Sequence, residues 1–160
     1  MIKFSLAALV LLLAACADSS GSRQATEFDL ANLAGGTVSL SSFRGKPVLV
    51  NFWATWCDTC REEMPDLEAL FRRSGGKFSV IGLSMDDNAD AAVPPFVKKH
   101  GLTFPMLVAD REVAAAYAVR GLPATFLIDG EGRIARRWVG PLDIRAAETD
   151  ILALLNGKSR

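Results

Sequence analysis

Apolar and polar positions alternate along this chain in blocks that predict strands and helices in turn. Several runs are apolar and rich in β-branched or aromatic side chains, which is typical of buried strands: 48–53, 78–83, 104–108 and 125–129. Others carry the apolar spacing of helices: 57–73, 88–100, 110–117 and 142–156. This alternation predicts an α/β fold with a central mixed sheet flanked by helices.

Glycine-containing turns predict two antiparallel hairpins. Residues 28–33 and 37–40 flank Gly35-Gly36 and predict a short N-terminal hairpin. The strands 125–129 and 133–139 flank a second glycine turn near the end of the chain. No linker-like composition interrupts residues 27–160, so we expect a single domain there.

The N-terminus has a different pattern. Residues 1–15 carry one positive charge and then an apolar run that ends in small residues, which predicts a secretory signal peptide. Polar residues from Asp18 onward end the run before the length of about 20 that a transmembrane helix needs. Residues 17–26 are polar and are predicted to form a flexible tether.

Composition narrows the classes of function. The formal net charge of zero excludes a strongly basic nucleic-acid footprint and an acidic disordered tail, so we expect no nucleic-acid partner. A hydrophobic content of 50% excludes global disorder. The count of three cysteines is odd, and in an oxidising compartment a leftover thiol needs an explanation.

The first cysteine supplies that explanation. The sequence Leu13-Ala14-Ala15-Cys16 resembles the lipobox of bacterial lipoproteins, which implies that Cys16 is acylated and becomes the mature N-terminus. The alternative is an ordinary signal peptide cut near Ala15, with an incidental cysteine. In enterobacteria, Asp directly after the acylated cysteine retains a lipoprotein in the inner membrane. This chain has Ala17 at that position, so the sequence does not decide whether the anchor lies in the inner or the outer membrane.

The other two cysteines carry the chemistry. Cys57 and Cys60 lie three residues apart at a predicted strand-to-helix junction, and this spacing brings both sulfurs to one face of the first helical turn. Unpaired N–H groups and the helix dipole favour the thiolate at Cys57. We therefore predict that Cys57 attacks a substrate disulfide and that Cys60 resolves the mixed disulfide.

Two other interpretations of this pair are possible. Half of a zinc site would need further ligands, and the other candidates are His100 and Cys16, so no metal site is predicted. An inert structural disulfide is the second, but such a short loop constrains few residues and stabilises the fold little.

The sequence around the cysteines resembles the TlpA/ResA branch of the thioredoxin superfamily. The matching segments are 50–57, 60–65 and, far downstream, 121–129, and the resemblance extends over about 28–155. It implies a thioredoxin-like fold with an extra helix–strand unit before the strand that follows a cis-proline. It also implies a membrane-anchored bacterial thiol–disulfide oxidoreductase, many of which serve cytochrome c maturation.

The resemblance also implies roles for individual residues. Pro123 is the cis-proline that faces the active-site disulfide, and Leu122 supplies backbone groups that contact substrate. Trp56 shields the disulfide and contacts substrate, whereas Trp53 is interpreted as a packing residue. Thr59 stands where many relatives have proline, a departure that bears on the reduction potential and its preferred direction rather than on the reaction class.

Glu63 is predicted to be a third functional group. On a helical wheel it falls inside the apolar arc, three residues after Cys60, so burial should raise its pKa and let it exchange protons near neutral pH. The resemblance implies a glutamate here that tunes the cysteines. The alternative is an arc-edge side chain that reaches water. Asp86, Asp87 and His100 are interpreted as solvated helix-end residues.

Together these patterns predict a lipid-anchored, extracytoplasmic oxidoreductase that reduces protein disulfides. Its expected partners are apocytochrome c or other envelope proteins and an inner-membrane electron donor of the DsbD/CcdA type. No prosthetic group is expected, because the electrons reside in the cysteine pair, and we expect a monomer. The alternatives are a peroxiredoxin-like thiol peroxidase and a non-catalytic envelope binding module.

Overall fold

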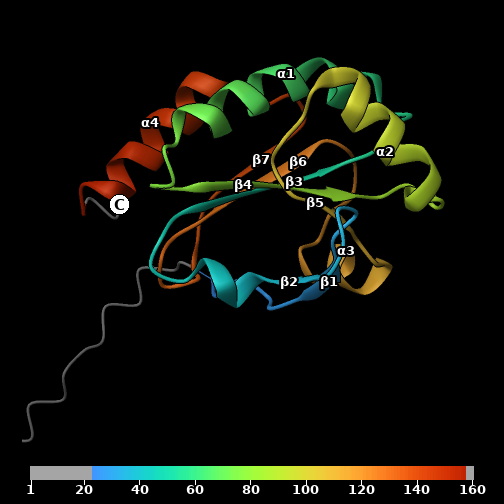
Figure 1. The fold of residues 1–160 in the computed structure, drawn as a ribbon. Coiled ribbons are helices and arrows are strands. Elements are labelled where there is room, and N and C mark those ends of the chain that lie inside the picture. The colour runs from blue at the N-terminus through green and yellow to red at the C-terminus, as the bar shows by residue number, and fades with distance from the viewer. Residues whose placement is uncertain (1–22, 158–160) are drawn as a thin grey trace, which may run out of the picture.

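A five-stranded mixed sheet forms the centre of the structure, a computed structural model that describes residues 23–157 (Figure 1). The order of the strands is β5-β4-β3-β6-β7. Strands β3, β4 and β5 pair in parallel, and β6 pairs antiparallel with both of its neighbours, β3 and β7. The strands are β3 (Val48–Trp53), β4 (Ser79–Ser84), β5 (Met106–Val108), β6 (Ala124–Ile128) and β7 (Ile134–Val139). The predicted signal peptide, Cys16 and most of the predicted tether lie outside the described residues.

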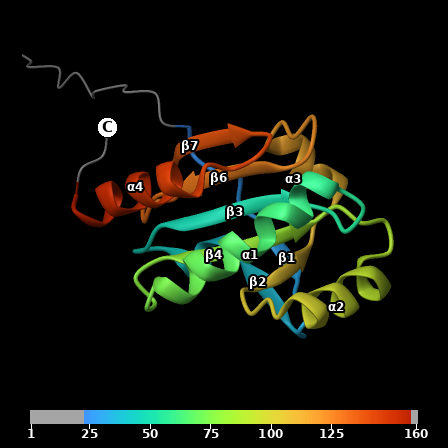
Figure 2. The same ribbon diagram turned by 90° about the horizontal axis from the view of Figure 1, so that it is seen from above.

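The helices lie on both sides of this sheet. Three of them, α1, α2 and α4, cover one face, and Figure 2 shows them from above. The opposite face carries α3 and the small hairpin β1–β2 (Figure 1). These elements are β1 (Asp29–Ala31), β2 (Thr37–Ser39), the 3-10 turn Leu40–Phe43, α1 (Asp58–Arg73), α2 (Ala89–His100), α3 (Arg111–Ala116) and α4 (Ile144–Leu155).

The central strand β3 explains why the sheet needs cover on both faces. All of its residues are buried, and successive side chains point to opposite sides. Leu49 and Trp53 join the core with α1 and α4, whereas Val50 and Phe52 join the core with α3 and the hairpin. Asn51 lies between Leu49 and Trp53 on the same face of β3, so this polar side chain points toward α1.

The predicted elements are confirmed, including both hairpins and the helix–strand unit α2–β5 that precedes β6. One boundary was wrong. Residues 23–26, assigned to a flexible tether from their polar composition, are bound to the β6–β7 turn, where the Ala25 N–H donates to the Gly132 carbonyl at 2.9 Å. Composition does not reveal such long-range pairing. No helix among the described residues is long and apolar enough to cross a membrane.

Candidate active site

The turn from β3 into α1 carries both cysteines. Cys57 has extended backbone angles and is the N-cap of α1, and its Sγ accepts a hydrogen bond from the Cys60 N–H at 3.2 Å. The two residues are joined by a disulfide bond, so the sulfurs lie together as the spacing predicted. Such non-helical angles are typical of an N-cap residue. The Cys57 N–H donates to the Ala54 carbonyl at 3.2 Å, which closes a turn between β3 and α1.

The surroundings of the two sulfurs differ. Cys57 is 9% exposed and sits at the positive end of the α1 dipole, whereas Cys60 is 0% exposed inside the first turn. The Cys60 N–H that donates to Cys57 Sγ is a group of the kind on which the predicted preference for a thiolate at Cys57 rests. Cys57 is therefore the more accessible of the two sulfurs, as the predicted order of attack requires, and the order itself stays a prediction.

The two tryptophans beside the cysteines have opposite environments. Trp56 is 65% exposed, next to Cys57, and offers an uncovered apolar surface at the site. Trp53 is fully buried, with its ring centroid 5.2 Å from that of Phe96. The prediction that Trp53 is a packing residue is confirmed.

The start of β6 borders the same edge of the sheet. Because Ala124 pairs with Phe52, Leu122 and Pro123 lie beside the end of β3, where the chain leaves for Cys57. The peptide bond between Leu122 and Pro123 is cis, as predicted. Pro123 is buried and its carbonyl accepts from the Gly140 N–H at 2.9 Å, while Leu122 is half-buried.

Glu63 is buried one turn of α1 beyond Cys60. Its Oε1 accepts from Asn51 Nδ2 at 2.8 Å and its Oε2 from the Leu142 N–H at 3.1 Å. Burial raises the pKa of Glu63, and these two hydrogen bonds offset only part of the rise. The alternative of a carboxylate that reaches water is wrong, because only 7% of the residue is exposed.

Sequence reasoning missed the partner of this carboxyl. Asn51 is fully buried, and its Nδ2 also donates to Thr125 Oγ1 at 3.0 Å, while its Oδ1 has no partner among the described residues. The signal was present, since Asn51 is a polar residue inside an otherwise apolar strand. Buried polar groups need partners, so such a residue points to a polar network.

Asp86 does not have the environment that the sequence predicted. It is 9% exposed rather than solvated, and α2 takes Asn88 as its N-cap instead. Its carboxylate accepts from the Thr55 N–H at 3.0 Å, from Thr55 Oγ1 at 2.6 Å and from Ser84 Oγ at 2.9 Å. The reason is topological, because β4 ends beside β3 and the chain after it meets the turn before Cys57.

The other polar candidates lie as predicted. Asp87 and His100 are exposed, and the His100 ring stacks on Phe96 at 4.2 Å between centroids. Within residues 23–157, no three His, Cys, Asp or Glu side chains are grouped so that they could hold a metal ion.

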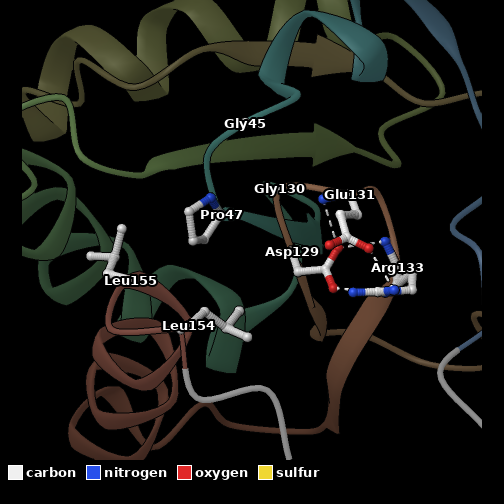
Figure 3. A pocket seen from close by; sticks show the side chains of 9 residues that line it. Gly45, Pro47, Asp129, Gly130, Glu131, Arg133, Leu154 and Leu155 are labelled. Atoms are coloured by element: carbon white, nitrogen blue, oxygen red, sulfur yellow. Dashed lines mark hydrogen bonds and ion pairs between the residues drawn. The ribbon is translucent and has the colours of Figure 1, made fainter. Parts of the chain in front are cut away.

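A cavity of about 430 Å³ lies at the other end of the sheet (Figure 3). Pro47, which precedes β3, lines it together with Leu154 and Leu155 of α4. Its charged groups are paired with one another, since Arg133 contacts Asp129 at 3.0 Å and Glu131 at 2.5 Å.

Comparisons with known proteins agree with this geometry. Residues 22–137 match the AhpC/TSA family. The chain is 36% identical over 128 residues to the thioredoxin-like protein YneN of Bacillus subtilis, which covers 79% of this chain and 75% of that protein. It is 35% identical to the thiol-disulfide oxidoreductase ResA of the same species, over 78% and 69% of the two chains. The crystal structure of a putative thiol:disulfide interchange protein DsbE from Chlorobium tepidum superposes with a TM-score of 0.76 at 30% identity, covering 84% of this chain and 96% of that one.

Proposed function

The chain belongs to the AhpC/TSA family and is a thioredoxin-like thiol–disulfide oxidoreductase, and on this premise we propose that it reduces disulfides of envelope proteins through Cys57 and Cys60. The observation that carries the proposal is the asymmetry of the pair. Cys57 is the N-cap of α1 and lies beside the exposed Trp56, whereas Cys60 is covered.

The proposed reaction has two exchange steps. The Cys57 thiolate attacks one sulfur of a substrate disulfide, that bond breaks, and a mixed disulfide forms while one substrate thiolate leaves. Cys60 then attacks Cys57 Sγ, which releases the second substrate thiolate and closes the enzyme disulfide. Two electrons pass to the substrate, and an external dithiol returns them, so no prosthetic group is part of the proposal.

Glu63 is proposed as the proton carrier of this reaction. It lies one helical turn after Cys60 on the buried side of α1, where burial raises the pKa of its carboxyl and so makes the carboxyl a better proton acceptor than an exposed glutamate. Ionisation of Cys60 before the second step requires such an acceptor. The pair Asn51 and Thr125 holds the carboxyl in place.

Trp56, Leu122 and Pro123 are proposed to bind the substrate chain. Trp56 is the exposed large side chain at the cysteine turn, and Leu122 and Pro123 form the neighbouring edge of the sheet. An extended substrate segment between them would place its disulfide over Cys57.

The setting of the reaction is proposed from the N-terminal sequence. A signal peptide over residues 1–15 and acylation of Cys16 would place a monomer in the cell envelope, facing the periplasm. Apocytochrome c is one candidate substrate there. Because that compartment oxidises thiols, the proposal includes an inner-membrane electron donor of the DsbD/CcdA type.

Trapping with Cys60→Ser tests the proposal. This variant cannot resolve the mixed disulfide, so we expect covalent complexes on Cys57 that a reductant releases and mass spectrometry identifies. The matched control, Cys57→Ser, should trap far less, because Cys60 is buried. Absence of any complex together with full activity of both variants would contradict the proposal and favour a non-catalytic binding module.

A peroxide assay distinguishes the proposed oxidoreductase from the remaining alternative, a thiol peroxidase. Reduced protein should consume hydrogen peroxide slowly compared with its reduction of a protein disulfide. Rapid peroxide consumption that depends on Cys57 alone would instead indicate a thiol peroxidase.

A further inference from the structure

The connection from α3 to β6 begins with an unusual backbone conformation. Tyr117 is the C-cap of α3, and its N–H donates to the Val113 carbonyl at 3.1 Å. The next residue, Ala118, has a φ of 51°, in the left-handed region. That conformation is uncommon for a residue other than glycine, because the Cβ atom comes too close to a backbone carbonyl oxygen. Contacts around Ala118 must therefore stabilise it.

The residues that follow have little support of their own. The Val119 N–H donates to the Ala114 carbonyl at 2.9 Å, but the backbone groups of residues 120–122 form no hydrogen bond within residues 23–157. Arg120 and Gly121 are exposed. The position of this stretch thus depends on the residues that flank it.

Strand β7 contacts both flanks. Arg137 Nη2 donates to the Ala118 carbonyl at 2.8 Å, and the Gly140 N–H, just after β7, donates to the Pro123 carbonyl at 2.9 Å. The Arg137 guanidinium also lies over the ring of Phe126, with Cζ 5.4 Å from the centroid, in a cation–π contact. Arg137 pairs with Phe126 across β6 and β7, so the sheet register places this side chain beside Ala118.

From these contacts we propose that Arg137 is a positioning residue, which fixes the substrate-binding segment 120–123 through the Ala118 carbonyl. The inference rests on the proposed contact of Leu122 and Pro123 with substrate. A segment that already has its bound conformation loses less conformational entropy when a substrate arrives. Arg137 should therefore matter for a substrate chain that lies along this segment, and not for the reactivity of the cysteines on α1, which covers the opposite face of the sheet (Figure 1).

The neighbouring arginine supplies a matched control. Arg136 and Arg137 are both exposed, and successive side chains of a strand point to opposite faces. Arg136 forms an ion pair with Asp150 of α4 at 3.1 Å. Arg136→Met therefore removes the same charge from the same strand and leaves the contact with Ala118 in place.

Two disulfides of different size test the proposal. The full-length reduced protein is mixed with insulin, a protein disulfide, or with hydroxyethyl disulfide, which is too small to lie along residues 120–123. The measured quantity is the ratio of the two second-order rate constants, which cancels changes in Cys57 reactivity and in the folded fraction. Arg137→Met should lower the ratio of insulin to small disulfide by about three- to tenfold, the range that loss of one hydrogen bond implies. Arg136→Met should leave it unchanged.

Ala118→Gly in the Arg137→Met background tests the route of the effect. Glycine adopts the left-handed conformation without the steric cost, so the double variant should recover part of the lost ratio. No recovery would show that Arg137 does not act through Ala118.

Three other outcomes would also overturn the inference. An unchanged ratio in Arg137→Met, with both rate constants kept or both lowered equally, would leave Arg137 with at most a structural role. An equal fall of the ratio in Arg136→Met would assign the effect to net charge. If the wild type reduces neither disulfide, the proposed oxidoreductase function fails and the inference with it, whereas the first two outcomes leave that function intact.

Discussion

Glu63 and Asp86 are two buried carboxylates that approach the cysteine pair from different elements. Glu63 lies in α1 and is held by Asn51 and by the Leu142 N–H. Asp86 follows β4 and binds Thr55, two residues before Cys57. The first is the proposed proton carrier, and the second holds the backbone of Thr55 in the turn that leads to Cys57.

Glu63→Gln should change how stability depends on pH. The raised pKa means that the folded state disfavours the ionised carboxyl. The free energy of unfolding of the wild type therefore falls as the pH rises from about 4.5, the unfolded value, through the folded pKa. We expect the stability of the variant relative to the wild type to be greater at pH 8 than at pH 4, as measured by urea unfolding.

The same variant should reduce protein disulfides more slowly near neutral pH, by about 10²-fold, because the proton carrier is lost. Glu62→Gln is the matched control, since its side chain is exposed on the same helix. It should change neither the rate nor the pH dependence of stability. An unchanged rate in Glu63→Gln would exclude its proposed role.

Thr55→Val tests whether Asp86 positions the cysteine turn. The substitution keeps the side-chain shape but removes the hydroxyl that donates to Asp86 at 2.6 Å. Loss of a hydrogen bond to a buried charged group should lower the free energy of unfolding by about 1.5–3 kcal/mol. We also expect Cys57 in the reduced protein to react more slowly with iodoacetamide, because the turn that presents it is less fixed.

Thr55→Ser keeps the hydroxyl and should restore both quantities. If Thr55→Val loses stability while Cys57 keeps its alkylation rate, the contact is structural and does not position the nucleophile.

At the scale of elements, α1 is attached to the rest of the molecule along its length. Its N-terminal half is connected through Glu63 to the start of α4. Its C-terminal half is connected through Glu68, whose carboxylate accepts from the Thr103 N–H at 2.7 Å and from Thr103 Oγ1 at 2.6 Å. The second contact ties α1 to the segment between α2 and β5, so the added helix–strand unit supports the helix that carries the cysteines.

Glu68→Gln should weaken this attachment in a pH-dependent way. Burial raises the pKa of Glu68, but the bonds from Thr103 and the ion pair with Arg72 outweigh it and lower the pKa overall. The stability that this carboxylate contributes is present above the unfolded pKa of about 4.5 and is lost as the pH falls through the folded value. We expect a loss of about 1–3 kcal/mol at pH 7 by urea unfolding, and a smaller loss at pH 3.

Asp66→Asn is the control for this experiment, because Asp66 is an exposed carboxylate on the same helix. A loss of stability in Glu68→Gln that is the same at both pH values would show that the contact depends on shape rather than on charge.

The elements themselves were predictable because their signals are local. The N-caps Asp110 and Asp143 each accept a hydrogen bond from the first turn of their helix, as short-range preferences lead one to expect. The attachment of residues 23–26 to the β6–β7 turn was not predictable, because it joins segments more than a hundred residues apart.

At the scale of the whole molecule, the sheet separates two ends with different properties. The cysteines, the exposed Trp56 and Pro123 gather where β3 ends and β6 begins. The cavity beside Pro47 and the contact of residues 23–25 with the β6–β7 turn lie where β3 begins.

The sequence by itself determined the reaction class, the Cys57–Cys60 pair, the order of the elements and the burial of Glu63. Each of these follows from spacing or periodicity within one segment, which local sterics and helix geometry set directly. Only the tertiary structure decided which residues from other elements contact Asn51, the partner of Glu63, and Thr55, in the turn before Cys57. Asn51 and Thr125 are 74 residues apart, and Asp86 lies 31 residues from Thr55, yet the register of neighbouring strands brings each pair into contact. Such contacts depend on how strands pair across the sheet, and no local pattern in the chain encodes that pairing.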